Sequence, residues 1–369
     1  MSIFGDKKLG FGLMRLEKTN GEIDLDKLCP LVDRFMSAGY NYFDTAYVYD
    51  GAEVAFREAV AKRYPRESFV VATKLAPWLL SDSFTPQMMF EEQLARLGVD
   101  YVDYYLLHSL QPSRGDALNR FGCFEFGAKL KKEGKIRYFG FSFHGGPDLL
   151  EELLSAHPEV DFVQLQINYA DWDDPAILSG PNYEVARRHG KEIIVMEPVK
   201  GGILSTLKKE AADILKPLSG GTPTSYAMRF NLSLDGVGMV LSGMNHMSQL
   251  DDNIATFDKA VPLSEEELSA LNRINEVFRT TKTVPCTDCK YCVKGCPVGI
   301  NIPAVFKGYN AVLTFGDHDR PHWHYGEVLR NGSAPASACI GCGECERACP
   351  QHIGIRKMLQ DLSKVFDKA

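Results

Sequence analysis

The chain has 369 residues, of which 45% are hydrophobic, so it can bury a large core and form roughly two or three domains. Its formal net charge is -7 at pH 7, without a long block of like charge, which excludes a basic stripe for nucleic acid or an anionic membrane surface. The N-terminus lacks the apolar segment of a secretory leader and no run approaches the length of a membrane span, so we expect a cytoplasmic protein whose partners are small molecules or other proteins.

Short apolar or alternating runs recur from residue 9 to about residue 243, and each is a candidate strand: LGFGL, NYFDTA, FVVATK, YVDYYLLH, IRYFGFS, FVQLQIN, EIIVMEP and GVGMVLSG. The segments between them carry apolar residues at helical spacing, and Thr85-Pro86 and Thr222-Pro223 are typical helix starts. Strands alternating with helices over roughly 250 residues predict an α/β fold of the (β/α)8, or TIM, barrel type rather than an open sheet. The missing Gly-x-Gly-x-x-Gly after an early strand argues the same way.

Polar residues stand at the ends of three consecutive predicted strands. Asp44 ends the second strand, Lys74 the third and His108 the fourth, while Tyr49 lies in the loop that follows Asp44. Because chemistry in this type of barrel takes place at the carboxyl ends of the strands, we expect these four side chains to reach one rim. Each residue by itself has an ordinary explanation, such as a helix cap or a packing aromatic, but their joint occurrence at consecutive strand ends favours a catalytic site.

The segment GYNYFDTAYVYD resembles a signature of the aldo-keto reductases, and VATK and YYLLH resemble the next two motifs of that family. The likeness covers roughly residues 5–278. It implies that Tyr49 is the general acid, that Lys74 lowers the pKa of its phenol, that Asp44 holds Lys74, and that His108 orients the carbonyl. A phenol with a reference pKa near 10 needs such tuning to protonate an alkoxide near neutrality.

The same resemblance implies a nicotinamide dinucleotide, NADH or NADPH, as cofactor. Ser142 and Gln166 are similar to the family's contacts to the carboxamide, Gly243 to a phosphate contact, and Asp252 and Asn253 to the adenine contacts. Hydrogen bonds within the barrel are the alternative roles for the serine and the glutamine. The cations that commonly grip a 2′-phosphate are replaced, at Gly243 and Gln249, so the choice between NAD and NADP stays open.

Residues 280–369 hold eight of the ten cysteines, which points to metal rather than disulfides. They form two runs of identical spacing, Cys-x-x-Cys-x-x-Cys-x-x-x-Cys-Pro, that begin at Cys286 and Cys339. In such a run three cysteines bind one [4Fe–4S] cube and the fourth binds the other cube. The segment resembles a bacterial-type two-cluster ferredoxin, and the likeness implies one cluster on Cys286, Cys289, Cys292 and Cys349, and a second on Cys339, Cys342, Cys345 and Cys296.

Zinc is the alternative for paired Cys-x-x-Cys knuckles, but three cysteines per run followed by Cys-Pro fit iron–sulfur clusters better. Clusters that merely staple the C-terminal segment are a second alternative. His318, His322 and His324 lie close together, yet no carboxylate or cysteine completes a recognisable ligand spacing, so packing or surface roles are favoured.

The pattern LSEEELSALNRINEVFR opens with a capping box of Ser264 and Glu267 and predicts a last amphipathic helix of the barrel. We therefore expect the barrel domain to span residues 1–279 and a small ferredoxin-like domain to span residues 280–369.

The two predicted halves handle electrons differently, since hydride transfer moves two at once and each cluster passes one. A flavin would reconcile them, but no flavin-binding motif is evident. The leading hypothesis is an oxidoreductase acting on a carbonyl/alcohol pair at Tyr49, with the clusters exchanging electrons with a redox protein or a nearby substrate. The alternative is an electron-transfer or redox-sensing module whose barrel serves as a binding scaffold. The substrate is not predicted, because it is selected by variable loops such as residues 109–127 and 199–222.

Overall fold

The computed structural model describes residues 2–112, 115–174 and 177–367, which form two compact units. The first unit comprises the chain up to residue 200 together with residues 220–265, and the second comprises residues 201–219 together with the chain from residue 266 onward. Two residues of the variable loop 109–127, residues 113 and 114, lie outside the described part. No helix within the described ranges is long and apolar enough to cross a membrane.

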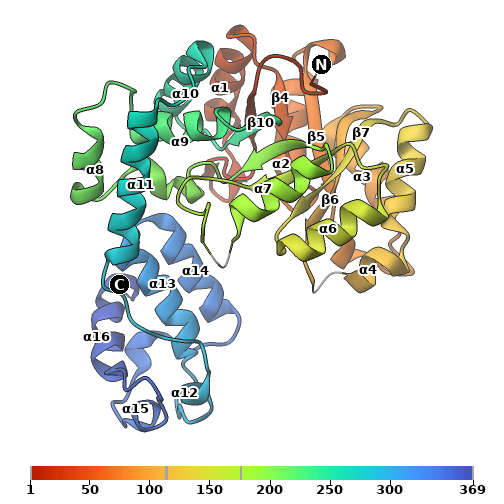
Figure 1. The fold of residues 1–369 in the computed structure, drawn as a ribbon. Coiled ribbons are helices and arrows are strands. Elements are labelled where there is room, and N and C mark those ends of the chain that lie inside the picture. Colours follow the sequence, from red (N-terminus) through yellow and green to blue (C-terminus); the bar gives the residue numbers. More distant parts are fainter. Residues whose placement is uncertain (1, 113–114, 175–176, 368–369) are drawn as a thin grey trace. The chain divides into compact units, whose positions relative to one another are not determined.

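The first unit is a closed barrel of parallel strands, which confirms the predicted fold (Figure 1). Around the barrel the strands follow the order β1-β10-β9-β8-β7-β6-β5-β4, and β1 pairs with β4 to close it. All the predicted strands are present. Their bounds are β1 Leu9–Gly12, β4 Tyr42–Asp44, β5 Val70–Leu75, β6 Val102–Leu110, β7 Ile136–Phe143, β8 Phe162–Gln166, β9 Glu192–Met196 and β10 Val237–Ser242.

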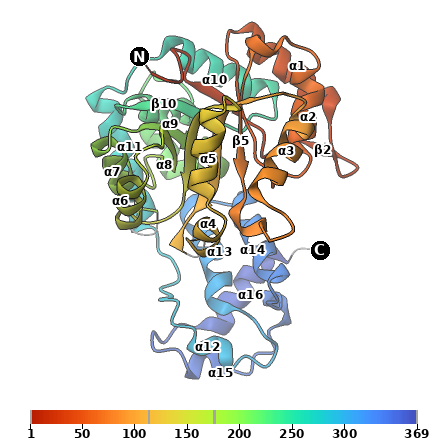
Figure 2. The ribbon, with the colours of Figure 1, turned by 90° about the vertical axis from the view of Figure 1, so that its right-hand side faces the viewer.

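Helices surround the strands: α3 packs against β5, and α5 packs against β6 and β7 (Figure 2). The helices of this unit are α1 Leu25–Ser37, α2 Ala52–Phe56, α3 Pro86–Leu97, α4 Gly115–Arg120, α5 Cys123–Lys132, α6 Pro147–Ala156, α7 Ser179–Arg188, α9 Pro223–Leu232 and α10 Met247–Lys259. Shorter elements are the hairpin of β2 Lys18–Thr19 and β3 Glu22–Ile23, a π-turn over Arg57–Ala61, and 3-10 turns over Arg66–Ser68 and Pro77–Leu79.

Both predicted helix starts are confirmed. The Thr85 hydroxyl accepts a hydrogen bond from the Met88 backbone N–H at the start of α3, and Thr222 caps Ser225 in the same way at the start of α9. In each case a proline follows the cap, where its missing N–H costs nothing because that group would have no partner within the helix.

Large aromatic side chains fill the interior of the barrel. Tyr42, Tyr104 and Phe162 project from three strands into one buried cluster, and Phe4, from the segment before β1, packs against it. The rings of Phe4 and Tyr104 stack with their centroids 4.9 Å apart. The barrel is thus a packed core rather than a pore, and polar chemistry is confined to the ends of its strands.

The second unit is helical and has a hydrophobic core of its own. Its helices are α8 Lys209–Leu215, α11 Glu265–Thr280, α12 Tyr291–Lys294, α13 Ile302–Phe315, α14 Asp319–Arg330, α15 Glu344–Arg347 and α16 Ile355–Phe366, with 3-10 turns over Lys200–Ser205 and Ala336–Ala338. The insert between the cysteine runs forms α13 and α14, which pack against each other.

The compact units differ from the predicted domain boundary at residues 279 and 280. Helix α11 belongs almost entirely to the second unit, in which Phe278 makes an edge-on contact with Phe315 at a centroid distance of 4.9 Å. The loop segment 201–219 also belongs to this unit, in which Lys208 Nζ donates to the Leu313 carbonyl oxygen. These long-range contacts leave no periodic pattern in the sequence.

Candidate active site and cluster sites

Two charged side chains meet near the carboxyl ends of neighbouring strands. Strand β4 ends at Asp44, and Lys74 is the penultimate residue of β5. The Lys74 Nζ atom lies 2.6 Å from Asp44 Oδ1 and donates to the Thr45 carbonyl oxygen at 2.6 Å. Only 1% of the Lys74 side chain and 5% of the Asp44 side chain are exposed. The two residues therefore form a buried ion pair, in surroundings where charges act strongly on one another.

Tyr49 and His108 lie beside this ion pair. The ammonium of Lys74 is 5.1 Å from the centre of the Tyr49 ring, and the rings of Tyr49 and His108 meet edge to face with centroids 5.8 Å apart. The structure thus brings together the four residues predicted for the rim. Trp78, which the sequence did not single out, also belongs here, since its ring lies 5.3 Å from that of His108.

Burial has the largest effect on the protonation of this group. Burial raises the pKa of the Tyr49 phenol above its ordinary value, and the nearby Lys74 ammonium opposes the shift without cancelling it. Burial alone would lower the pKa of Lys74, but the charges of Asp44 and Tyr49 outweigh it and that pKa is raised. Lys74 therefore stays charged. Lys74 thus acts on the phenol in the expected direction, but desolvation outweighs the cation and the pKa of Tyr49 stays above its ordinary value.

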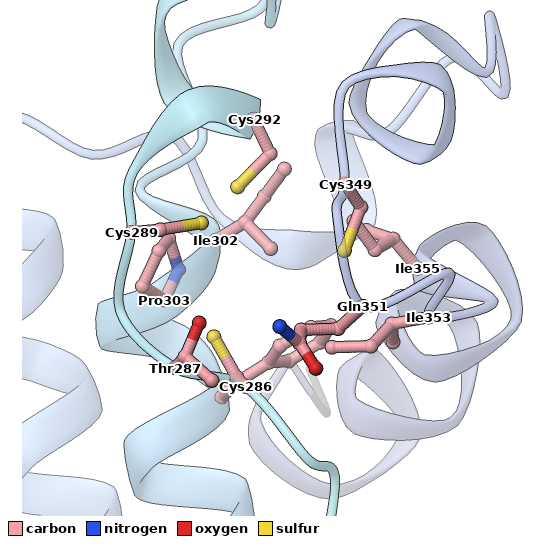
Figure 3. A pocket seen from close by; sticks show the side chains of 11 residues that line it. Cys286, Thr287, Cys289, Cys292, Ile302, Pro303, Cys349, Gln351, Ile353 and Ile355 are labelled. Carbon is pink, nitrogen blue, oxygen red and sulfur yellow. The ribbon is translucent and has the colours of Figure 1, made fainter.

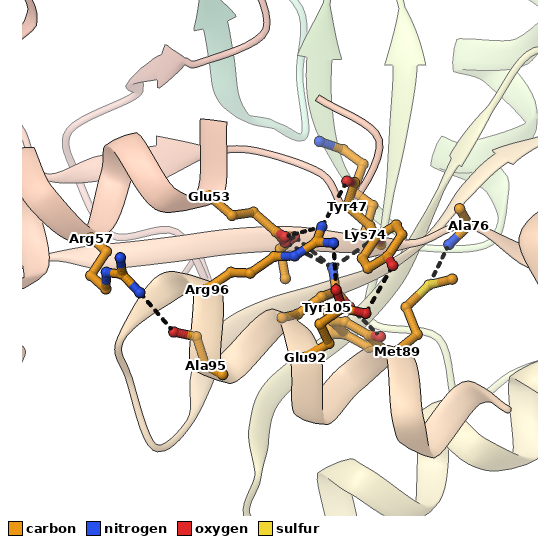
Figure 4. Close-up of polar contacts among 12 residues, drawn as sticks. Tyr47, Glu53, Arg57, Lys74, Ala76, Met89, Glu92, Ala95, Arg96 and Tyr105 are labelled. Atoms are coloured by element: carbon orange, nitrogen blue, oxygen red, sulfur yellow. Dashed lines mark hydrogen bonds and ion pairs between the residues drawn. The ribbon is translucent and has the colours of Figure 1, made fainter. Parts of the chain in front are cut away.

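A buried polar network supports Lys74 from the side of α2 and α3 (Figure 4). The Glu53 carboxylate accepts hydrogen bonds from Thr73 Oγ1 at 2.7 Å and Gln93 Nε2 at 3.0 Å. The Gln93 amide also donates to the Lys74 carbonyl oxygen at 3.1 Å and accepts from the Tyr105 hydroxyl at 2.8 Å. These bonds hold the end of β5 in place from outside the barrel.

The residues expected at the carboxamide already have partners within the barrel. Ser142 Oγ accepts a hydrogen bond of 2.7 Å from the backbone N–H of Ser109, a residue with a positive φ of 56°. Gln166 Nε2 donates to Asp171 Oδ2 at 2.9 Å, and Asp171 is also paired with Lys200. Asp171 is completely buried and was not predicted, although it follows β8 by only five residues.

The segment after β10 contains the residues expected at the phosphate and the adenine. A Cβ at Gly243 would have no neighbour closer than 3.9 Å, so its backbone is open to close approach. Asp252 accepts a hydrogen bond of 2.7 Å from the Thr222 hydroxyl. Asn253 is buried and donates to Ser242 Oγ at 2.9 Å, while its Oδ1 atom has no hydrogen-bond partner in the described chain.

Gln249 has a structural role at the start of α10. Its side-chain oxygen accepts hydrogen bonds from the backbone N–H groups of Asn245 at 3.0 Å and His246 at 3.3 Å, as part of a capping box. Backbone donors at a helix start are suited to phosphate binding. Here two backbone N–H groups that lie just before the helix donate to the side chain of Gln249 instead.

An ion pair that the sequence reading missed joins two loops at the same end of the barrel. Arg15, three residues after β1, contacts Glu197, the residue directly after β9, at 3.0 Å. Glu197 has a positive φ of 58°, and its charge acts on Tyr49 by raising the pKa of the phenol. Glu197 stands near the end of the seventh predicted strand, EIIVMEP, just as Asp44, Lys74 and His108 stand at the ends of the second, third and fourth. The same signal in the sequence therefore points to Glu197.

Four cysteines of the second unit surround one hollow. Cys286, Cys289 and Cys292 come from the first run and Cys349 from the second, and Figure 3 shows their sulfur atoms directed into the hollow. Apolar side chains, among them Ile302 and Ile355, form much of the remaining wall. Burial raises the pKa of the Cys292 thiol to about 11, so metal binding must supply the free energy for thiolate formation.

A second hollow is lined by the other four cysteines: Cys296, Cys339, Cys342 and Cys345. The fourth cysteine of each run thus faces the hollow of the opposite run. Ile302 lines both hollows and forms a shared apolar wall. The Ile300 backbone N–H lies 3.3 Å from Cys296 Sγ, the kind of contact that tunes cluster potentials.

The arrangement of the cysteines distinguishes a cluster site from a site for a single ion. A tetrahedral zinc ion with Zn–S bonds of about 2.3 Å needs its ligands close together. In the described part of the chain no group of three or more His, Cys, Asp or Glu side chains is arranged to hold one ion. Four cysteines that line one hollow, three of them from a single run, fit an iron–sulfur cube instead.

The three clustered histidines have protein partners. His318 and His324 lie within hydrogen-bond distance of the carbonyl oxygens of Phe315 and Ala304, at 2.9 and 3.1 Å. His322 pairs with Asp317 at 2.5 Å.

A parallel (β/α)8 barrel with a buried lysine, carboxylate and imidazole and a partly buried phenol at one end belongs to the class of barrel oxidoreductases, here joined to a cysteine-rich unit. Residues 8–276 match the model of the aldo/keto reductase family, and the chain belongs to that family. Residues 285–353 match the 4Fe-4S dicluster domain, so two [4Fe–4S] clusters are cofactors of this oxidoreductase.

Relatives of known name agree with the family assignment. An aldo-keto reductase of Mycolicibacterium vanbaalenii is 30% identical over 249 residues, which are 66% of this chain and 82% of the relative. L-galactose dehydrogenase of Arabidopsis thaliana is 26% identical, over 73% of this chain and 90% of its own length. The fold is similar to that of an aldo-keto reductase from Klebsiella pneumoniae crystallised with NADPH, with a TM-score of 0.60 at 22% identity over 73% of this chain and 90% of that one.

Proposed function

We propose that the barrel interconverts a small carbonyl compound and its alcohol, and that the cysteine-rich unit exchanges single electrons with a redox protein. The convergence of Tyr49 and His108 on the buried Lys74–Asp44 pair carries the first part of the proposal. The two four-cysteine hollows carry the second part.

Each residue of the barrel site has a role that follows from its contacts. Tyr49 donates its phenolic proton to the oxygen of the carbonyl being reduced. The Lys74 ammonium favours the phenolate left behind and thereby opposes the effect of burial. Asp44 holds the ammonium in position through the 2.6 Å contact. His108, whose ring faces that of Tyr49, orients the carbonyl from the other side.

The barrel residues fit a nicotinamide dinucleotide, which when bound supplies or accepts the hydride. Asn253 Oδ1 is a buried acceptor without a partner in the described residues and is available to the adenine, together with Asp252. Gly243 leaves room for a phosphate. Ser142 and Gln166 would hold the carboxamide, with orientations already set by Ser109 and Asp171. Because Gln249 caps α10, no cation from the start of that helix discriminates NADPH from NADH.

In the second unit we assign Cys286, Cys289, Cys292 and Cys349 to one cluster and Cys296, Cys339, Cys342 and Cys345 to the other. Ile302 lines both hollows and places an apolar side chain between them. Apolar surroundings lower the local dielectric, which is one of the factors that set cluster potentials.

The test is an anaerobic assay of Tyr49→Phe against the wild type and against Tyr47→Phe. Tyr47 lies two residues away, and its hydroxyl bonds Glu92 rather than a residue of the site. We expect Tyr49→Phe to lose about 100-fold or more of carbonyl turnover and Tyr47→Phe to keep most of it, with equal iron content in all three proteins. Unchanged turnover in Tyr49→Phe removes the barrel chemistry from the proposal. Absence of NADH and NADPH binding by calorimetry would favour the scaffold alternative.

A further inference from the structure

The two cysteine runs have identical spacing, so their intervening residues can be compared position by position. Lys290 and Tyr291 in the first run correspond to Gly343 and Glu344 in the second, and Lys294 corresponds to Arg347. The two runs also share one feature of exposure: Cys289 and Cys342, the second cysteine of each run, are both exposed. The surfaces beside the two hollows therefore differ mainly in the side chains at the compared positions.

Charges beside the second hollow are neutralised within the unit. Arg347 pairs with Glu344, three residues before it in α15. Arg356 pairs with Glu346 at 2.8 Å. The large exposed side chain in this run is Ile340, which is 66% exposed and uncharged. This side of the unit therefore has little net charge to attract a charged partner.

Charges beside the first hollow are not neutralised. Lys290 and Lys294 are exposed and form no ion pair or hydrogen bond through their side chains with any described residue. Between them Tyr291 is 62% exposed and its ring has no aromatic or polar partner in the same part of the chain. We call these three residues the basic patch. Asp288 offsets one of the two lysines, so the charged side chains of this run other than the cysteines keep a net positive charge.

The positive charge is local, since the whole chain carries a formal net charge of -7. The negative net charge of the chain repels an acidic protein, which can approach only where the local surface charge is positive. Complementary charges at that place speed the encounter and fix its orientation. An exposed tyrosine flanked by the charges supplies the aromatic anchor that protein interfaces favour.

We propose that the basic patch of Lys290, Tyr291 and Lys294 is the docking surface for an acidic one-electron carrier protein. This inference rests on the proposed redox role of the second unit and names the side of that unit where the partner binds. In each productive encounter the reduced carrier gives up one electron and the chain takes up one. The neutral surface around Ile340 is not used for this encounter.

The test uses the full chain with both clusters assembled, kept without oxygen. The probe is an acidic plant-type ferredoxin, and the basic protein cytochrome c serves as the comparison. Binding is measured by calorimetry at several salt concentrations for the wild type, for Lys290→Glu with Lys294→Glu, and for Lys132→Glu with Lys259→Glu. The last pair changes the net charge equally at exposed lysines of the barrel unit, outside the basic patch.

We expect the patch variant, Lys290→Glu with Lys294→Glu, to bind ferredoxin at least about ten-fold more weakly than the wild type and with a smaller salt dependence. The barrel variant, Lys132→Glu with Lys259→Glu, should bind within about two-fold of the wild type. Tyr291→Ala should weaken binding while the salt dependence stays unchanged. Bound ferredoxin should protect Lys290 and Lys294 from acetylation, whereas cytochrome c should not.

Equal weakening in both charge variants, or absence of lysine protection, overturns the docking surface. Spectra with dithionite separate this failure from that of the proposed function. If the assembled clusters accept electrons from dithionite but the patch variant binds ferredoxin as the wild type does, only the docking surface is wrong. If the chain assembles no clusters that dithionite reduces, the proposed redox role fails and the docking surface fails with it.

Discussion

Lys74 Nζ and Asp44 Oδ1 lie 2.6 Å apart, on neighbouring strands of a closed barrel, with both side chains almost fully buried. A buried ion pair contributes little net stability, because the loss of hydration offsets most of the Coulomb attraction. Removing one partner, however, leaves an uncompensated charge in the protein interior. The pair is thus best explained by what it does to Tyr49, whose ring is 5.1 Å from the ammonium.

Replacing Lys74 by methionine should separate stability from activity. In Lys74→Met the Asp44 carboxylate stays buried without its cation, so the free energy of unfolding should fall by about 3–5 kcal/mol. The double variant Asp44→Asn with Lys74→Met should regain most of this loss in urea unfolding. Carbonyl turnover should stay low in both variants. Recovery of turnover in the double variant would contradict the role given to Lys74.

The pH dependence of carbonyl reduction should follow the raised pKa of Tyr49. In the proposed reaction the neutral phenol is the proton donor, and its pKa in the protein lies above the ordinary value of 10.0 because burial outweighs Lys74. The rate should therefore be insensitive to this group at neutral pH and fall only as pH rises above about 10. The Glu197→Gln variant should move this limb to lower pH, because the Glu197 charge raises the phenol pKa. Profiles of kcat/KM against pH measure both effects.

The raised pKa of Tyr49 should also make the stability of the fold depend on pH. A tyrosine whose pKa is higher in the folded than in the unfolded chain stabilises the fold fully below the unfolded pKa, and this contribution is lost as pH rises through the folded pKa. Tyr49, Tyr42 and Tyr105 all have pKa values raised by burial. Urea midpoints should thus decrease above about pH 10. A urea midpoint that rises over this pH range would contradict the raised pKa values of these phenols.

The crossed arrangement of cysteines predicts different iron contents for two double variants. Cys339→Ala with Cys349→Ala removes a ligand from each hollow, whereas Cys286→Ala with Cys349→Ala removes two ligands from the same hollow. The first should lose both clusters, and the second should keep about four of the roughly eight irons of the wild type. The opposite result would place Cys349 on the cluster of its own run. Cys123→Ala, at a buried thiol of the barrel, is the control.

The network behind Lys74 predicts a large effect for a residue that does not touch the substrate. Gln93→Leu leaves the Tyr105 hydroxyl and the Lys74 carbonyl oxygen without their Gln93 contacts and removes a donor from Glu53. We expect a loss of about 2–4 kcal/mol in the free energy of unfolding and a lower kcat, because Lys74 is displaced. Gln87→Leu on the same helix, whose exposed amide bonds Glu91, should cost under about 0.5 kcal/mol.

The sequence alone was sufficient for the features that depend on local pattern. All the predicted barrel strands are present, since apolar runs bounded by helix signals need only nearby residues to be recognised. The spacing of the cysteine runs predicted a domain with two [4Fe–4S] clusters for the same reason. Asp44, Lys74 and His108 were found because each stands near the end of a strand and parallel strands in a barrel end on the same rim.

Other features were decided only by the tertiary structure. The Arg15–Glu197 pair, the contact of Trp78 with His108 and the burial that raises the pKa of Tyr49 all depend on distances between residues far apart in the chain. The same holds for residues 201–219, which lie among the barrel segments in sequence but pack with the second unit. Covalent connection limits the conformations of neighbouring residues. Which distant side chains meet, and how much water they lose, is set only when the barrel closes and the helices pack.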